Sequence, residues 1–158
     1  MRQIPKKNYV ILILMIIGVV VVTCLGARIY NNTIKTSSIL YKYLKTIKGD
    51  ELNLYLNENP STVIYISDRY DVSKEGLEEK LKDRIIELNL YENFIYLDKE
   101  QLTPSFIADF NKQNETSITI SKLPTLIVFN DNEVEIIYYS LKEEDVKTID
   151  FEGVRWLT

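Results

Sequence analysis

A proline stands at the entrance to a stretch that otherwise has the composition of a buried β-strand. Residues 118–129 read ITISKLPTLIVF, and four apolar residues follow Pro124 and Thr125. Because proline cannot donate the backbone hydrogen bond that a strand interior needs, Pro124 must open the strand or lie on an edge. The bond before a proline is also the one that adopts the cis form at low cost. Pro124 therefore fixes where this strand begins, and the other elements must be arranged around it.

The chain between residues 50 and 150 alternates strand-like and helix-like segments. Short β-branched and aromatic runs indicate strands, whereas apolar residues spaced three or four apart indicate helices. Strands are expected at 62–67, 94–98, 126–129 and 133–140, and helices at 51–57, 73–90, 104–112 and 142–150. Two strand–helix units require parallel strands with right-handed crossovers, and the closing hairpin adds an antiparallel edge. The pattern predicts a mixed four-stranded sheet with helices on both faces.

Local signals predict further details of these elements. In the helix at 73–90, Glu78 and Lys82 are placed on an outer face, since opposite charges four residues apart stabilise an exposed helix. The hairpin turn at 130–132 reads Asn-Asp-Asn, residue types that tolerate positive φ. Trp156, near the C-terminus, is expected to pack back on the domain.

This element order, with a proline opening the third strand, resembles that of thioredoxin-like proteins over about residues 50–150. The strands VIYIS (63–67) and FIYLD (94–98) are also similar to those of small thioredoxin-like proteins of Gram-positive bacteria, among them the bacteriocin-transport accessory group. The resemblance implies an α/β domain at residues 50–158, in which a mixed four-stranded sheet is flanked by helices.

The residues that would carry redox chemistry in such a domain are missing. In thioredoxins a Cys-x-x-Cys motif follows the first strand, at a helix N-terminus that lowers the pKa of the first thiol. Here residues 67–73 read SDRYDVS, and Cys24 is the one cysteine of the sequence. We therefore expect no enzyme, no catalytic residue and no cofactor. The resemblance still implies a groove beside Pro124, which in active relatives pairs with an extended peptide through backbone hydrogen bonds.

Seven residues are expected to line that groove. They belong to the loop after the first strand and to the entrance of the third: Asp68, Arg69, Tyr70, Asp71, Leu123, Pro124 and Thr125. Other interpretations stay open for each group. Asp68 and Asp71 could form a carboxylate pair for acid–base chemistry or a cation, but at a helix start they more simply accept from free N–H groups. Arg69 and Tyr70 also suit a solvated loop, and Pro124 a purely structural role.

A run of nineteen uncharged residues occupies positions 9–27. As a helix it extends about 28 Å, close to the thickness of the hydrocarbon layer of a membrane. Basic residues predominate on its N-terminal side, which predicts a cytoplasmic segment at 1–8, a transmembrane helix at 9–28 and an external C-terminal part. Residues 29–48 then follow as a juxtamembrane helix or stalk, because their apolar residues recur at roughly helical spacing.

Other interpretations of the apolar run stay open. Gly26 and Ala27 at its end also suit a cleaved signal peptide, although the run is long for one. The sequence Val-Thr-Cys ending at Cys24 loosely matches a lipoprotein signal. A reversed orientation, with the domain in the cytoplasm, is a further alternative.

The composition excludes several classes of function. Residues 29–158 hold fifteen of the 19 basic residues and all 23 acidic ones, a net charge of about −8. Such a domain repels nucleic-acid phosphates, so nucleic-acid binding is not expected. With no histidine and one cysteine, the chain lacks the ligands of a zinc site, and no metal is expected.

These observations together predict a single-pass protein of the cell membrane whose domain lies outside the cytoplasm. Its expected function is to bind or scaffold a protein partner, and the family resemblance points to export or cell-envelope assembly. The alternative is a thiol–disulfide oxidoreductase accessory that acts through another chain's cysteines, or a lipoprotein anchored at Cys24. The expected partners are therefore a membrane, through one spanning helix, and a protein.

Overall fold

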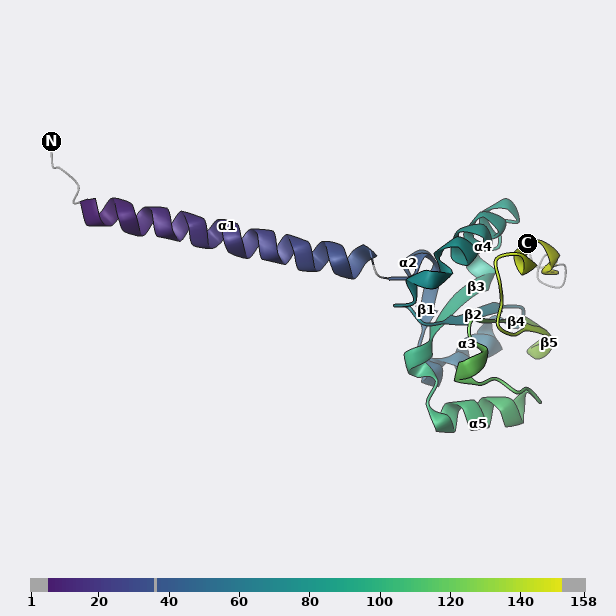
Figure 1. The fold of residues 1–158 in the computed structure, drawn as a ribbon. Helices are drawn as coiled ribbons and strands as arrows, with labels where there is room; N and C mark the ends of the chain where they lie inside the picture. The colour runs from purple at the N-terminus through teal and green to yellow at the C-terminus, as the bar shows by residue number, and fades with distance from the viewer. Residues whose placement is uncertain (1–5, 36, 152–158) are drawn as a thin grey trace. The chain divides into compact units, whose positions relative to one another are not determined.

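The chain divides into two compact units, Met1–Thr36 and Ser37–Thr158. In this computed structural model the described residues are 6–35 and 37–151, drawn in colour in Figure 1. The predicted packing of Trp156 lies outside the described residues, as do positions 152–158 of the predicted domain.

One long helix makes up the described part of the first unit. The helix α1 spans Lys6–Lys35, and its segment Tyr9–Tyr30 is long and apolar enough to cross a membrane. No part of that segment is buried inside the protein. The Thr23 hydroxyl donates to the carbonyl of Val19 at 2.9 Å, which satisfies it within the helix. Polar groups of a helix in lipid need such internal partners.

Five strands of the second unit form one mixed sheet in the order β1-β3-β2-β4-β5. Their bounds are β1 Lys45–Ile47, β2 Val63–Ser67, β3 Phe94–Asp98, β4 Thr125–Asn130 and β5 Glu133–Tyr138. Both β1 and β2 run parallel to β3, whereas β4 is antiparallel to β2 and β5 to β4. The predicted mixed sheet is confirmed, and β1 adds a fifth strand to it. The parallel direction predicted for β4 is wrong, because the chain returns to the carboxyl end of β2 before β4 begins.

Helices cover both faces of this sheet (Figure 1). Their bounds are α2 Ile39–Tyr43, α3 Leu52–Glu58, α4 Glu75–Glu87 and α5 Pro104–Gln113. Successive side chains of a strand point to opposite faces, so β2 contributes to two cores. Tyr65 packs on the face covered by α2 and α4, and Ile64 on the face covered by α3 and α5.

The expected helix at residues 29–48 is wrong in its second half. Ser38 caps a separate short helix, α2, and β1 follows almost at once. Leu40 and Leu44 are buried in the core of the second unit, and their spacing of four matches the single turn that α2 provides. Residues 45–47 then pair with β3. A three-residue strand carries too short a pattern to be recognised in a sequence.

The entrance and the exit of β4 agree with the sequence. The strand begins at Thr125, directly after Pro124, and the Leu123–Pro124 peptide bond is cis. At its far end, Asp131 and Asn132 have φ values of 51° and 66° and form the predicted hairpin turn. Both φ values lie in the left-handed region that Asn and Asp tolerate.

The predicted helix at residues 142–150 is reduced to a 3₁₀ turn at Asp145–Thr148. Side chains there form hydrogen bonds with nearby backbone groups that would otherwise pair within a helix. The amide of Lys142 donates to the carboxylate of Asp145 at 2.9 Å, and the hydroxyl of Thr148 donates to the Asp145 carbonyl at 2.7 Å. Such local bonds compete with helix formation.

Glu78 is not on an outer face as predicted, because its side chain is 1% exposed. Its Oε2 atom accepts hydrogen bonds from the Ser38 hydroxyl and the Ile39 amide at 2.7 Å each, and from the Leu40 amide at 3.3 Å. Its Oε1 atom accepts from the Tyr65 hydroxyl at 3.4 Å. Burial raises the pKa of Glu78, while these donors oppose the rise. One carboxylate thus fastens the start of α2 to α4 and β2.

Candidate functional site

A cavity of about 140 Å³ lies at the carboxyl end of β2, beside Pro124. Its lining comes from the loop after β2, the residue after β3 and the segment that enters β4: Ser67, Asp68, Asp71, Lys99, Ile120, Leu123 and Pro124. Among these, Asp68, Asp71, Leu123 and Pro124 are residues that the sequence predicts for the groove. The structure brings these four together around one cavity.

The loop after β2 is held by its own two aspartates. Asp68 Oδ1 accepts from the Tyr70 amide at 2.9 Å, and Asp71 Oδ1 accepts from the Ser73 amide at 3.0 Å and from the Ser73 hydroxyl. Bonds from an Asp side chain to the amide two residues later are typical of turns. Asp71 is also the N-cap of the 3₁₀ turn at Val72–Lys74, the capping role that its position indicates.

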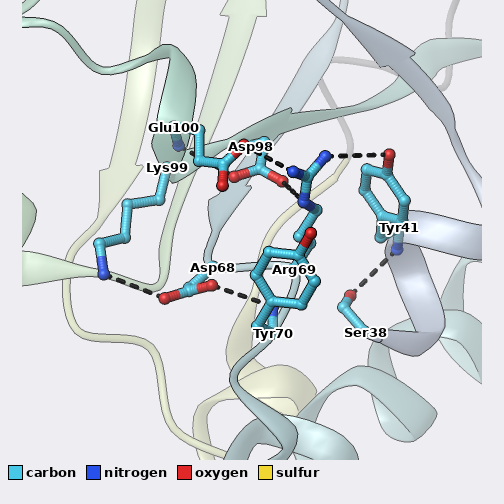
Figure 2. A network of polar contacts seen from close by, with 8 residues as sticks. All are labelled: Ser38, Tyr41, Asp68, Arg69, Tyr70, Asp98, Lys99 and Glu100. Carbon is cyan, nitrogen blue, oxygen red and sulfur yellow. Dashed lines mark hydrogen bonds and ion pairs between the residues drawn. The ribbon is translucent and has the colours of Figure 1, made fainter. Parts of the chain in front are cut away.

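Arg69 joins this loop to two other elements, as Figure 2 shows. Its guanidinium lies 3.3 Å from Asp98 Oδ2 at the end of β3 and 2.6 Å from Glu100 Oε2. It also donates to the Tyr41 hydroxyl of α2 at 3.5 Å, and its carbonyl accepts from the Ser38 amide at 2.7 Å. The solvated-loop interpretation is therefore wrong for Arg69, whose side chain is 27% exposed.

The charges of the site have distinct environments. The Tyr70 amide, Lys99 and Arg69 hold the pKa of Asp68 below its usual value, with Lys99 Nζ 3.0 Å from Asp68 Oδ2. Burial raises the pKa of Asp98 in spite of the neighbouring Arg69. Arg69 Nε and Asp98 Oδ2 are close enough for an ion pair but make no hydrogen bond with described residues. The neighbours of Asp68 thus favour its ionised form, whereas burial disfavours the ionised form of Asp98.

Three exposed apolar side chains belong to the two segments that line the cavity. Tyr70 is 54% exposed, Val72 49% and Ile120 48%. Across residues 37–151 the other large apolar side chains with comparable exposure are Leu54, Ile86 and Tyr91. Half of these exposed side chains therefore belong to the loop after β2 or to the segment that enters β4. Of the three, Ile120 lines the cavity, while Tyr70 and Val72 flank the lining residue Asp71 in the sequence. We call this cavity the Pro124 groove.

The backbone at the groove has an open acceptor. The carbonyl of Lys122 accepts from the Ser140 amide at 2.8 Å, and the carbonyl of Pro124 accepts from the Leu141 amide at 2.9 Å. Between them, the carbonyl of Leu123 accepts no hydrogen bond from the described residues. A free carbonyl beside a sheet is the kind of group that pairs with an added strand.

Comparison with known proteins gives matches of fold only. No family model matches the chain, and no curated protein matches it. Mitochondrial thioredoxin 3 of Saccharomyces cerevisiae aligns in structure at 14% identity, over 68% of this chain and 93% of its own, with a TM-score of 0.47. Thioredoxin O2 of Arabidopsis thaliana aligns at 17% identity, over 70% and 94%, with a TM-score of 0.43.

The strand order decides the fold class. Strand β2 is parallel to β3, β4 is antiparallel to β2 and β5 to β4, and β1 extends the sheet at one edge. The fold is thioredoxin-like. In it the Pro124 groove occupies the place, between the loop after β2 and the entrance to β4, where the sequence analysis expects the groove.

Thr125 differs from the other predicted groove residues. It is fully buried, and its hydroxyl donates to the Lys122 carbonyl at 2.9 Å. Its side chain therefore fixes the entrance to β4 instead of lining the groove.

Sequence reasoning missed Ser67, Lys99 and Ile120 in the lining of the groove. A signal for Lys99 existed, because β2 and β3 are parallel neighbours and Ser67 lies opposite Asp98. The residues after two parallel strands meet at one edge of a sheet, as Asp68 and Lys99 do. No comparable pattern identifies Ile120. Among the described residues, no group of three or more His, Cys, Asp or Glu side chains is placed to hold a metal ion.

Replacing Arg69 by alanine is expected to lower the free energy of unfolding by about 1–3 kcal/mol. The change leaves the buried carboxylate of Asp98 without its cation. Urea unfolding of the full-length protein in a nonionic detergent, followed by the near-ultraviolet circular dichroism of its tyrosines, measures the effect. Arg84→Ala is the matched control, because Arg84 forms only an exposed pair with Glu87 and should change stability by about 0.5 kcal/mol or less. Equal effects of the two changes would contradict the role given to Arg69.

Proposed function

We propose that this protein is a membrane-anchored, redox-inactive thioredoxin-like module that binds an extended segment of a partner protein in the Pro124 groove. The observation that carries the proposal is a cavity of about 140 Å³ beside Pro124 that the exposed side chain of Ile120 lines, with the exposed residues Tyr70 and Val72 on either side of the lining residue Asp71. Exposed apolar groups that cluster at a concave site are typical of protein-binding surfaces.

The backbone of the groove supports an extended ligand. Strand addition uses main-chain hydrogen bonds for affinity and pockets for alternate side chains for specificity. The free carbonyl of Leu123 supplies a main-chain acceptor, and the cavity beside it supplies a pocket. Both features lie within the same short segment of the chain, so one extended peptide can use them together.

Binding of this kind needs no sulfur chemistry. The loop that would carry the two thiols reads SDRYDVS, and Cys24 lies within the apolar segment of α1. A thiolate attack on a disulfide requires a thiol at the site. We therefore assign the groove a binding role and no catalytic one.

The anchor places this module at a membrane surface. Tyr9–Tyr30 would cross the bilayer as a single span, and the basic residues before it favour a cytoplasmic N-terminus. The domain would then face the outside of the cell membrane, where its partner would be an exported or envelope protein. The external position and the pathway rest on charge distribution and on the family resemblance.

Photo-crosslinking from the loop that lines the groove tests the proposed function. With p-benzoylphenylalanine in place of Tyr70, the full-length protein in intact cells should form a specific crosslinked adduct with a partner protein. Tyr91 is the matched control position, since it is 44% exposed and precedes β3, at the other end of the strand from Asp98. Adduct formation from Tyr91 but not from Tyr70, or from neither position, would contradict a partner in the Pro124 groove.

A further inference from the structure

We infer that the segment bound in the Pro124 groove carries a lysine or arginine whose side chain enters the cavity and pairs with Asp71. The inference rests on the proposed function and specifies the chemistry of the partner. Three features support it: the negative charge around the cavity, the unused acceptor atom of Asp71 and the apolar residues in the cavity lining.

The charge around the cavity favours a cation. The loop after β2 and the end of β3 present four carboxylates, Asp68, Asp71, Asp98 and Glu100, against the two cations Arg69 and Lys99. The described residues 37–151 as a whole hold 22 acidic and 13 basic residues, a net charge of −9. Such a surface attracts cationic segments and repels anionic ones.

The cations that are present leave Asp71 available. Arg69 pairs with Asp98 and Glu100, and Lys99 pairs with Asp68. Asp71 uses Oδ1 for the amide and hydroxyl of Ser73. Its Oδ2 atom has no ion pair or hydrogen bond with a described residue, so a carboxylate oxygen that lines the cavity still has acceptor capacity.

The remaining wall of the cavity matches the stem of a long basic side chain. Ile120, Leu123 and Pro124 are the apolar part of the cavity lining that also includes Asp68 and Asp71. Lysine and arginine bury their methylene groups against apolar surface while their charged ends reach polar partners. A short apolar side chain would cover the apolar lining but leave Asp71 Oδ2 without a donor. An acidic side chain would enter a cavity lined by two carboxylates and one cation, Lys99, which already pairs with Asp68.

A peptide series measures this preference. Four fluorescein-labelled peptides, Ser-Thr-Val-X-Val-Thr-Ser with X as Lys, Arg, Gln or Glu, are titrated with the full-length protein in a nonionic detergent, and fluorescence anisotropy gives each Kd. The Kd values of the Lys and Arg peptides should be about tenfold lower than that of the Gln peptide, because a charge-assisted hydrogen bond contributes roughly this factor to affinity. The Glu peptide should bind most weakly of the four.

Two variants assign the preference to Asp71. In Asp71→Asn the tenfold advantage of Lys over Gln should disappear, while the cap of the 3₁₀ turn is kept because asparagine caps as well as aspartate. Asp131→Asn is the matched control, since Asp131 is exposed in the hairpin turn at the far end of β4 and should leave the advantage intact.

The outcomes separate the inference from the proposed function. Equal Kd values for the four peptides, or an advantage of Lys that survives in Asp71→Asn, would overturn the inference. Absence of binding by every peptide would overturn it as well. In each of these cases the photo-crosslinking experiment at position 70 tests independently whether a partner protein binds in the groove.

Discussion

Replacing Glu78 by alanine is expected to lower the free energy of unfolding by about 3–5 kcal/mol. The carboxylate is buried and accepts from the Ser38 hydroxyl, two amides at the start of α2 and the Tyr65 hydroxyl. Alanine leaves several of these donors buried without an acceptor, and each unpaired group costs about 1–3 kcal/mol. Urea unfolding of the full-length protein in a nonionic detergent, followed by tyrosine circular dichroism, gives the difference.

Two comparisons make this prediction specific. Glu79→Ala is the same chemical change one position along α4, at an exposed side chain, and should stay within about 0.5 kcal/mol of the unaltered protein. Glu78→Gln keeps a carbonyl acceptor in the same place and should fall between the two. A loss at Glu78 no larger than the loss at Glu79 would show that the carboxylate does not hold α2.

Leu40→Ala is expected to destabilise the domain by about 2–5 kcal/mol, the range for a buried leucine. Leu40 has no exposed surface and packs in the core formed with α4, β2 and β3, although it lies only a few residues after α1. Its removal opens a cavity and also loosens the helix that Glu78 holds. The measurement is the same unfolding experiment, on the full-length protein.

Leu54→Ala is the matched control for Leu40→Ala. Leu54 belongs to α3 but is 64% exposed, so the same truncation should change stability by about 0.5 kcal/mol or less. If Leu40→Ala were equally mild, residues 39–44 would be a linker to the domain and not part of its core.

The sequence predicts the elements whose pattern is local and repeated. The runs at β2 and β3 are β-branched and aromatic, and Pro124 marks the first residue of β4, so these strands could be located before the fold was known. The turn at Asp131 and Asn132 follows from turn chemistry. The antiparallel direction of β4 does not follow from the element order, which predicts a parallel strand.

The features that could not be predicted depend on partners distant in sequence. The spacing of Glu78 and Lys82 fits an exposed helix face, but it also allows the Glu78 side chain to be buried. Only the hydrogen bond from Ser38, forty residues earlier in the sequence, decides between the two positions. The strand at residues 45–47 forms because β3 offers it an edge, which no local pattern indicates. The position of Arg69 likewise depends on α2 and the end of β3.

The hydrogen bond from the Ser38 amide to the Arg69 carbonyl, 2.7 Å long, has a mechanical consequence. Residue 38 is where the chain coming from α1 enters the domain, and Arg69 belongs to the loop that lines the groove. Tension applied along the polypeptide at that point loads this bond together with the hydrogen bonds from residues 38–40 to Glu78. Force on residue 38 is therefore transmitted to Arg69, in the loop that lines the cavity.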